Sequence, residues 1–333
     1  MPEPIFIDAT PGTVGYTFGG RDPIATIRPG ELVHLRTFDC FGGKVTSVSD
    51  LPSKVCQFPY LNPVTGPLWV EGARPGDTLA VHVVDLAPAA EVGWSATFPH
   101  FGALTGTPTT AMLHPALEER VWQYAIDVDA GTVGYTARGG DYTADLSLEP
   151  MLGTIGVAPA AGEVRLSIVP GPHGGNLDTP LIAAGTTVYL PVGAEGALLA
   201  VGDGHARQGD GELCGVAVEV PMDVVLCVEV IPDVVTRLPR LETDTRLISI
   251  GIARPLDDAY RSAHADLIAH LCELTGLDLL DAYQLVSQDG MARIGNMVDA
   301  QYTITADLDK RLLKGVQAYR GAHERLSLVG GLW

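Results

Sequence analysis

Basic residues are scarce in this chain of 333 residues, and their scarcity argues against two classes of partner. The chain has 21 Lys and Arg residues against 40 Asp and Glu residues, so its formal net charge at pH 7 is −19. A protein that binds nucleic acid or an anionic membrane normally presents a basic face. We therefore expect neither a nucleic-acid nor a membrane partner. Most of the acidic excess is typical of a solvated surface, although some carboxylates could also converge on cations.

Paired cysteines and long apolar runs are also lacking. The five cysteines include no Cys-x-x-Cys pair, which argues against a disulfide framework and a cysteine-rich zinc site. No window approaches the roughly 20 uninterrupted apolar residues that cross a bilayer. The N-terminal Met-Pro-Glu-Pro-Ile lacks the basic segment and apolar run of a signal peptide. We expect a cytoplasmic protein.

Several catalytic motifs are missing as well. The sequence contains no Gly-x-Ser-x-Gly nucleophile elbow, no phosphate-binding loop and no His-Glu-x-x-His helix. It also lacks the Gly- and Ser-rich tract with a lysine that serine amidases use. A serine-based amidase is therefore disfavoured.

Short β-branched runs between turn signals dominate the first two-thirds of the chain. Arg28-Pro-Gly-Glu31 and Arg74-Pro-Gly-Asp77 each precede a run of this kind. Pro presets φ and Gly accepts the positive φ of the next turn position, so each segment indicates a turn that leads into a strand. No low-complexity linker divides the chain. We predict a mixed α/β fold that is mainly β: one interwoven domain over residues 1–333, β-rich over 1–250, with helices packed on one side.

Helical spacing is strongest near the C-terminus. Apolar residues recur on one helix face between Asp257 and Leu274, and a second helical segment follows over 277–286. We predict strands over 238–251 and 291–304 beside these helices, and a short helix after Leu312. Similar spacing over 110–126 predicts one more helix.

Asp203-Gly-His205 and Asp210-Gly-Glu212 form the first polar cluster. Asp203 and His205 follow an apolar run, and residues two apart on a strand share a face. The segment between the two pairs is rich in turn formers, so a hairpin would bring them side by side. Crowded carboxylates raise one another's pKa, and a divalent cation removes the conflict. The alternative is an ordinary Asp- and Gly-rich turn.

Pro172-His173-Gly-Gly-Asn176-Leu-Asp178 forms the second cluster. His, Asn and Asp side chains can bind metals or donate and accept hydrogen bonds, and paired glycines let the backbone approach a ligand closely. A loop with Asx turns would explain Asn176 and Asp178 equally well. Little side-chain bulk surrounds His173 in the sequence, so packing explains it less readily.

A third polar position, Asp39, ends the first strand that a Pro-Gly turn precedes. It stands before a diglycine turn, so a turn-forming role competes with a ligand role. Cys40 follows it directly. A reactive thiolate requires a base or a positive field nearby, and the sequence supplies neither. We interpret Cys40 as a small buried apolar residue.

These segments resemble the acetamidase/formamidase family. The resemblance rests on Gly66-Pro-Leu-Trp-Val-Glu-Gly-Ala-Arg-Pro-Gly-Asp77, on Pro172-His-Gly-Gly-Asn-Leu-Asp178 and on Val201-Gly-Asp-Gly-His-Ala-Arg-Gln-Gly-Asp-Gly-Glu212. It implies a layered β/β/α fold, a homodimer or higher homo-oligomer, a bound divalent metal, and release of ammonia from a short amide such as formamide or acetamide. Leu177 departs from the family's His-Gly-Gly-Asn-Cys-Asp form, which could alter the pocket.

The clusters and the resemblance together give a hypothesis for the site. The expected metal ligands are His173, Asp178, Asp203, His205 and Glu212, with Asp39 possible. The expected catalytic residues are Glu212, as general base, with Asp203 and His205; the expected substrate-binding residues are Gly174, Gly175, Asn176 and Gln208. Zinc is the first expectation because imidazole and carboxylate suit it, and calcium is an additional candidate.

Two other functions stay open at this point. The chain could hydrolyse another amide, a cyclic amide or a carbamoyl compound. It could also be a metal-stabilised β protein that binds a small ligand without turnover; a closed coordination shell would favour that alternative.

Overall fold

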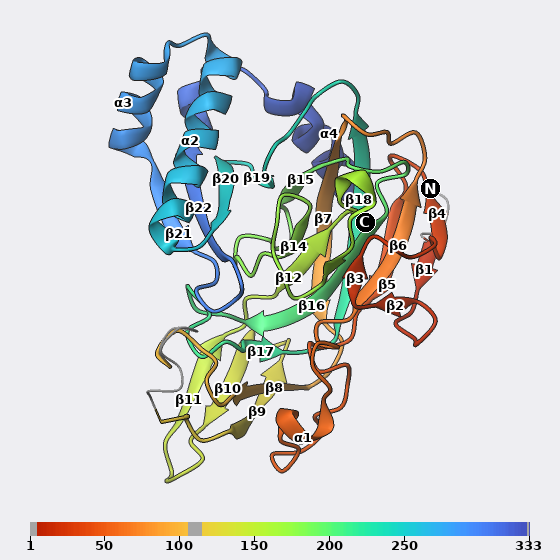
Figure 1. Cartoon of the computed structure of the whole chain (residues 1–333), viewed down its shortest axis with the longest axis vertical. Coiled ribbons are helices and arrows are strands. Elements are labelled where there is room, and N and C mark those ends of the chain that lie inside the picture. The colour runs from red at the N-terminus through yellow and green to blue at the C-terminus, as the bar shows by residue number, and fades with distance from the viewer. Residues whose placement is uncertain (1–4, 106–114, 332) are drawn as a thin grey trace.

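Two stacked β-sheets and a layer of helices make up the fold of this computed structural model (Figure 1). The structure describes residues 5–105, 115–331 and 333. The first sheet runs in the order β1 (Ile5–Ile7), β5 (Leu32–Arg36), β18 (Met222–Ile231), β7 (Thr78–Pro88), β15 (Thr187–Pro191), β19 (Arg240–Glu242), β20 (Arg246–Ala253), β22 (Tyr302–Asp309) and β21 (Met291–Ile294).

The second sheet carries most of the polar residues discussed below. Its order is β11 (Thr143–Ser147), β10 (Thr132–Thr136), β9 (Arg120–Asp127), β8 (Val92–Thr97), β17 (Val218–Glu219), β16 (Leu199–Arg207), β12 (Met151–Gly156) and β14 (Gly174–Asn176). Strand β6 (Val64–Val70) pairs with β16 and also with β2 (Val14–Gly15) and β4 (Ala25–Ile27), while β3 (Thr17–Phe18) pairs with β13 (Arg165–Leu166).

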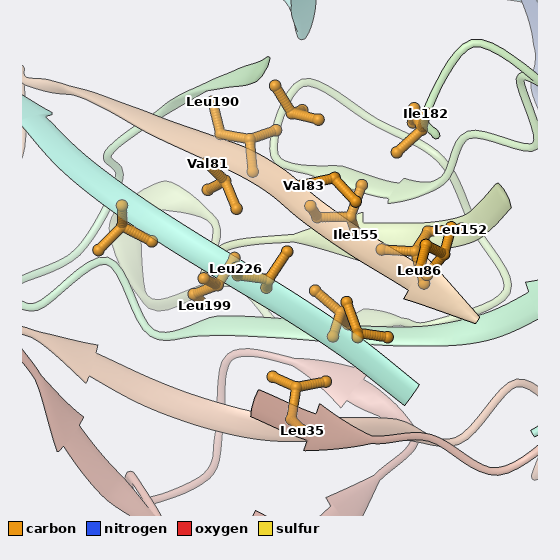
Figure 2. Close-up of a cluster of buried hydrophobic side chains, with 14 of the residues drawn as sticks. Leu35, Val81, Val83, Leu86, Leu152, Ile155, Ile182, Leu190, Leu199 and Leu226 are labelled. Carbon is orange, nitrogen blue, oxygen red and sulfur yellow. The ribbon is translucent and has the colours of Figure 1, made fainter. Parts of the chain in front are cut away.

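The main hydrophobic core lies between the two sheets (Figure 2). Alternate residues of a strand point to opposite faces, and β7 follows this rule: Val81 and Val83 enter the inter-sheet core, whereas Ala80 faces the helices. Figure 2 shows these side chains with those of the other sheet, including Leu152, Ile155 and Leu199. The central strands are therefore buried on both faces, which explains their continuous apolar sequence.

Helices α2 (Leu256–Thr275), α3 (Leu279–Asp289) and α4 (Ala322–Gly330) cover the outer face of the first sheet. Helix α1 (Pro52–Val55) is a single short turn outside this layer. Helix α2 buries Ala259, Ala263 and Leu267 at helical spacing against β20 and β22. Helix α4 contacts β7 and β18. The order of layers is therefore sheet, sheet, helix, with α1 lying apart in the loop before β6.

Most elements expected from the sequence are confirmed. The mainly β fold with helices on one side, the strands after the Pro-Gly turns, and the C-terminal helices all lie where the patterns place them. Strand pairs β19–β20 and β21–β22 occupy the predicted strand ranges. The extent of the single domain, residues 1–333, stays a prediction.

The prediction of a helix over residues 110–126 is wrong for residues 115–126, which the structure describes. Residues 120–127 form strand β9, in which burial changes between successive residues; residues 110–114 lie outside the described residues. Leu177, which could have altered the pocket, is fully buried in the core between the sheets.

Two structural features concern the expected cytoplasmic location, namely the pairing of the cysteines and the length and apolarity of the helices. All five cysteines lie in the described part of the chain and are free. Among the helices of the described residues, none combines the length and the apolarity that a membrane span requires.

His82, a buried residue of β7 that lies beside α4, should make the free energy of unfolding depend on pH. His82 is 3% exposed, and its Nδ1 lies 2.9 Å from Thr187 Oγ1, which also lies 2.8 Å from Nδ1 of His323 on α4. Burial, with a smaller contribution from His323, lowers the pKa of His82 from 6.5 to about 4. The unfolded chain therefore binds a proton between these pH values that the folded chain does not bind.

We expect His82→Gln to weaken this dependence. The contribution of His82 makes the folded state less stable as pH falls from 6.5 towards 4, by about 2 kcal/mol at pH 5. Urea unfolding at pH 7 and pH 5 should show a smaller loss in the variant than in the parent. His100→Gln, at an exposed position, is the control. Equal losses in His82→Gln and the parent would contradict the assignment.

Candidate functional site

Strand register brings polar residues of the second sheet to one place. Thr154 on β12 stands opposite Asn176 on β14. On the other side of β12 lies β16, which carries Asp203 and His205. The next strand, β17, places Glu219 directly opposite His205. Four neighbouring strands thus contribute to one cluster.

The cluster consists of buried carboxylates around one imidazole. Ligand atoms of Asp178, Asp203 and His205 lie within 4.8 Å of one another, and those of His205, Glu212 and Glu219 form a second group at the same spacing. His205 Nε2 is 3.4 Å from Asp203 Oδ1 and 3.3 Å from Glu219 Oε2. Each of these side chains is at most 7% exposed.

Negative charge in the cluster is not balanced by the protein. Over residues 5–105 and 115–331, neither lysine nor arginine forms an ion pair with the carboxylates of the cluster. Burial is the main factor that raises the pKa values of Asp178 and Glu212 well above their ordinary values, and it raises the pKa of Glu219 to about 7. Burial opposes the charge on His205, but Glu219 and Asp203 outweigh it and raise the pKa of this imidazole.

Unpaired polar atoms in the cluster are suited to binding a cation. The atoms without a hydrogen-bond partner among the described residues include Asp178 Oδ1, Asp203 Oδ1, His205 Nε2 and Glu219 Oε2. Buried polar atoms are rarely left without partners, because their desolvation then goes uncompensated. Three acidic oxygens and one imidazole nitrogen are also a donor set that suits a divalent transition metal. The residues therefore fit such an ion.

Gln208 fixes the orientation of the imidazole. Its Oε1 lies 2.9 Å from His205 Nδ1, and its Nε2 donates to the carbonyl oxygen of Asp178 at 2.6 Å. A proton on Nδ1 leaves Nε2 of the neutral ring free to face the carboxylates. A hydrogen bond from the remote ring nitrogen is the usual way to orient a metal-binding histidine. Gln208 is not among the residues that line the cavity described below, so its predicted role in substrate binding has no support from the cavity lining.

Asn176 connects the carboxylates to one another. Its Nδ2 donates to Asp178 Oδ2 at 2.6 Å and to Asp299 Oδ2 at 2.9 Å, while its Oδ1 accepts from Asn62 Nδ2 at 2.9 Å. Asn62 also donates to Asp203 Oδ2 at 2.8 Å. The side-chain amide of Asn176 is thus fully engaged and positions acids rather than substrate, although Asn176 lines the cavity.

Backbone conformation at the site is unusual. Asp178, Asp203 and Glu212 have φ values of 44°, 60° and 48°. Non-glycine residues rarely adopt this left-handed region, and such residues are concentrated at functional sites. Asp203 adopts this conformation within β16, whereas Asp178 and Glu212 adopt it in the loops after β14 and β16.

A cavity of about 790 Å³ opens onto this cluster. Its acidic and amide lining residues are Asn62, Asn176, Asp203, Glu212, Glu219 and Asp299, which we call the acidic floor. Asp299 comes from the loop between β21 and β22 of the first sheet, so both sheets contribute to the cavity. Burial raises the pKa of Asp299 to about 7.

Two of the predicted substrate-binding residues lie outside the cavity. Gly174 and Gly175 have left-handed φ values of 96° and 91° and are packed against the backbone of Ile155 and Val169, outside the cavity lining. The Gly174 amide donates to the Gly171 carbonyl, so an oxyanion role for it is not supported.

His173 is buried beside Phe18, with ring centroids 5.2 Å apart, and burial lowers its pKa to about 4. Among the described residues it belongs to none of the metal-capable groups.

Two further acidic residues have structural roles. Asp39 is buried, and its Oδ1 accepts a hydrogen bond from the Gly43 amide at 2.9 Å, as a turn residue would. It lies outside the metal-capable groups of the described chain. Asp210 is paired with Arg293 at 2.7 Å on the surface. The predicted hairpin exists, but it places Glu219, not Asp210, beside His205.

Glu219 and Asp299 were missed as site residues. Glu219 stands alone among apolar neighbours in Val216-Ala-Val-Glu-Val220, and an acid inside a buried strand was a usable signal. Asp299 lies far away in the sequence, and no motif around it indicates a site. Cys40, interpreted as a buried apolar residue, is 7% exposed, and burial raises its pKa well above its ordinary value; it also lies within ligand distance of Asp203 and Glu219.

The chain matches one family model and is similar to solved structures of two acetamidases. Residues 21–163 and 98–306 match the model of the Acetamidase/Formamidase family. The structure is similar to an acetamidase from Yersinia enterocolitica, with 41% identity, a TM-score of 0.86 and coverage of 93% of this chain and 94% of that chain. An acetamidase from Bacillus halodurans gives 33% identity, a TM-score of 0.84 and coverage of 94% and 100%.

Curated relatives match over a shorter span. A formamidase from Methylophilus methylotrophus is 26% identical over 58% of this chain and 58% of its own length. The chain spans about three-fifths of the length of the curated relatives that it matches.

Gly153 offers a direct test of how tightly the cluster is packed. A Cβ at this position would lie 2.5 Å from Asp203 Oδ2 and 2.6 Å from Asp178 Oδ1. We expect Gly153→Ala to lower the free energy of unfolding by about 1–3 kcal/mol and to weaken Zn(II) binding, because the carboxylates must move apart. Urea unfolding and calorimetric titration with Zn(II) measure the two effects.

Gly209→Ala is the matched control, since a Cβ there meets no atom within 4 Å. Binding of Zn(II) by Gly153→Ala with parental affinity would show that the cluster does not hold the ion.

Proposed function

Because the chain belongs to the acetamidase/formamidase family, we propose that it hydrolyses the C–N bond of primary amides, formamide and acetamide among them, to a carboxylate and ammonia. The observation that carries this proposal is the acidic floor: carboxylates that no lysine or arginine of the described residues balances line a cavity, and the oriented imidazole of His205 lies beside two of them. The names of the similar solved structures, both acetamidases, support the same reaction.

The proposal includes a divalent metal, with zinc as the first candidate and calcium as a possible second ion. Asp178, Asp203 and His205 would hold the metal, with Glu219 as a further ligand, since each has an unpaired atom in the cluster. A metal bound there would polarise an amide carbonyl and make a neighbouring water more acidic. Gln208 would keep the imidazole in the orientation that binding requires.

Glu212 is the best candidate for the general base. Glu219 Oε1 accepts from the Ala217 amide, and its unpaired Oε2 is assigned to the metal, so neither oxygen is left for the attacking water. Asp299 accepts from Asn176 and Asn296. By contrast, the Glu212 carboxylate accepts no hydrogen bond from the described residues, and it lines the cavity.

In the proposed reaction Glu212 takes a proton from the attacking water as the bond from water oxygen to carbonyl carbon forms. It then returns that proton to the amide nitrogen as the C–N bond breaks, so that ammonia leaves and a carboxylic acid remains, which becomes the carboxylate by giving its own proton to ammonia or water. Burial of Glu212 favours this exchange, because it raises the pKa of the Glu212 carboxyl well above its ordinary value and so helps the group to hold the proton between the two steps.

The proposal also covers the compartment and the assembly state. The free cysteines support our inference of a cytoplasmic location, and a homodimer or higher homo-oligomer stays a prediction.

Metal removal tests the metal requirement. Treatment with a chelator followed by gel filtration should abolish ammonia release from acetamide, and addition of Zn(II) should restore it. Far-UV circular dichroism checks that the metal-free protein stays folded. Undiminished turnover by metal-free protein would refute the metal-dependent mechanism. Metal binding without ammonia release from a panel of linear, cyclic and carbamoyl amides would instead identify a non-catalytic binding protein.

Replacement of Glu212 tests the base. Glu212→Gln keeps the size of the side chain but cannot accept a proton, so kcat should fall about 100-fold or more. Zn(II) affinity should change little, because Glu212 is not assigned as a ligand. Glu91→Gln, at an exposed position, is the control and should retain parental kcat. A Glu212→Gln protein with parental kcat would exclude Glu212 as the base.

A further inference from the structure

The cavity is much larger than the simplest amides require. Its volume is about 790 Å³. Acetamide has four non-hydrogen atoms, and at roughly 30 Å³ for a water-sized group it needs on the order of 100 Å³. Cavities of roughly 300–1,000 Å³ usually hold drug-sized ligands. A short amide bound at the acidic floor would therefore leave most of the cavity to water.

Most of the rest of the lining is apolar, with Ser53 as a hydroxyl side chain among it. Beyond the acidic floor, the residues that carry the argument are Phe41, Leu61, Phe98, Phe101, Ile168 and Val169, which we call the apolar wall. All but Phe41 are half-buried, so apolar surface stays in contact with solvent inside the cavity. Transfer of such a surface from water to an apolar ligand group is favourable in proportion to its area.

Aromatic rings give the wall its shape. Phe98 and Phe101 lie edge to face, with ring centroids 6.0 Å apart and an interplanar angle of 90°. Aromatic groups prefer this arrangement, and a third ring can extend it. Phe101 lies directly over Gly215, where no side chain intervenes. Phe41 is fixed in a buried hydrophobic cluster, and Phe98 packs against the same cluster.

We propose that the preferred substrate is a primary amide with an aromatic acyl group, of the arylacetamide class. The amide group lies at the acidic floor and the ring lies against the apolar wall. This inference rests on the proposed function, because it assigns the reacting group to the carboxylate cluster. The reaction is the same: water oxygen bonds to the acyl carbon, the C–N bond breaks, and the nitrogen leaves as ammonia with the water's proton.

The test compares phenylacetamide with acetamide. Ammonia release by the zinc-loaded, full-length protein should give a kcat/KM at least tenfold higher for phenylacetamide. One buried methylene already changes kcat/KM by roughly tenfold or more in an apolar pocket, so a whole ring should exceed that value. An equal or higher kcat/KM for acetamide would overturn the inference while the proposed amidase function stands.

Two variants connect the preference to the wall. Phe101→Ala removes a ring that the substrate contacts, and Val169→Phe fills part of the cavity. Each should lower the ratio of kcat/KM for phenylacetamide to that for acetamide at least threefold. Phe6→Ala, an exposed phenylalanine on β1, is the control and should leave the ratio unchanged. An unchanged ratio in both wall variants would place the ring elsewhere and overturn the inference.

Binding of the products separates this inference from the proposed function. Calorimetric titration should show tighter binding of phenylacetate than of acetate. If no amide releases ammonia but phenylacetate binds at least tenfold more tightly, the hydrolase proposal fails and the aromatic pocket stands. If acetate binds as tightly as phenylacetate, the pocket assignment fails.

Discussion

Repulsion among buried carboxylates is the constraint on which the rest of the site depends. Asp178, Asp203, Glu212 and Glu219 surround a single imidazole, and the described protein provides no lysine or arginine to balance them. Removal of an ion from water costs several kcal/mol even after relaxation. An arrangement of this kind is stable only if the acids bind protons or a cation. The unpaired atoms of the cluster favour the cation.

The fold maintains this arrangement by drawing on both sheets. Strand β16 supplies Asp203 and His205, and the loop between β21 and β22 brings Asn296 and Asp299 from the other sheet. Met297 of that loop donates to the Gly211 carbonyl, which ties the loop to the β16–β17 connection. The core between the sheets therefore sets the distances within the site, because any slip of one sheet against the other would move Asp299 relative to the other acids.

Patterns of residues close together in the sequence predicted the structural features that depend only on neighbouring residues. The spacing of Asp203 and His205 in a strand, followed by turn formers, indicated a hairpin with both side chains on one face, and the structure has it. The same reasoning paired Asp210 with them, but Asp210 lies in the surface turn and bonds Arg293. Over residues 110–126 a chance match to helical spacing concealed a strand, in which period-two burial decides the structure.

Contacts between distant segments could not be predicted in this way. Glu219 faces His205 only because β17 pairs with β16 in one register, and a shift of one residue would turn it away. Asp299 enters through a loop of the other sheet. His173 looked like a ligand because its sequence neighbours are glycines, yet Phe18, far away in the sequence, encloses it. The residues next to a side chain in the sequence do not show which distant residues will bury it.

The apolar wall affects the chemistry at the acidic floor through the dielectric constant inside the cavity. Electrostatic interactions strengthen as water is displaced, so the field of the carboxylates at a bound amide depends on how dry the cavity becomes. A ligand that fills the space beside Phe98 and Phe101 displaces that water, whereas a four-atom amide does not. Recognition of the acyl group and activation of the amide group are therefore coupled. The same side chains that select a large apolar substrate also create the low-polarity surroundings in which Glu212 can exchange a proton.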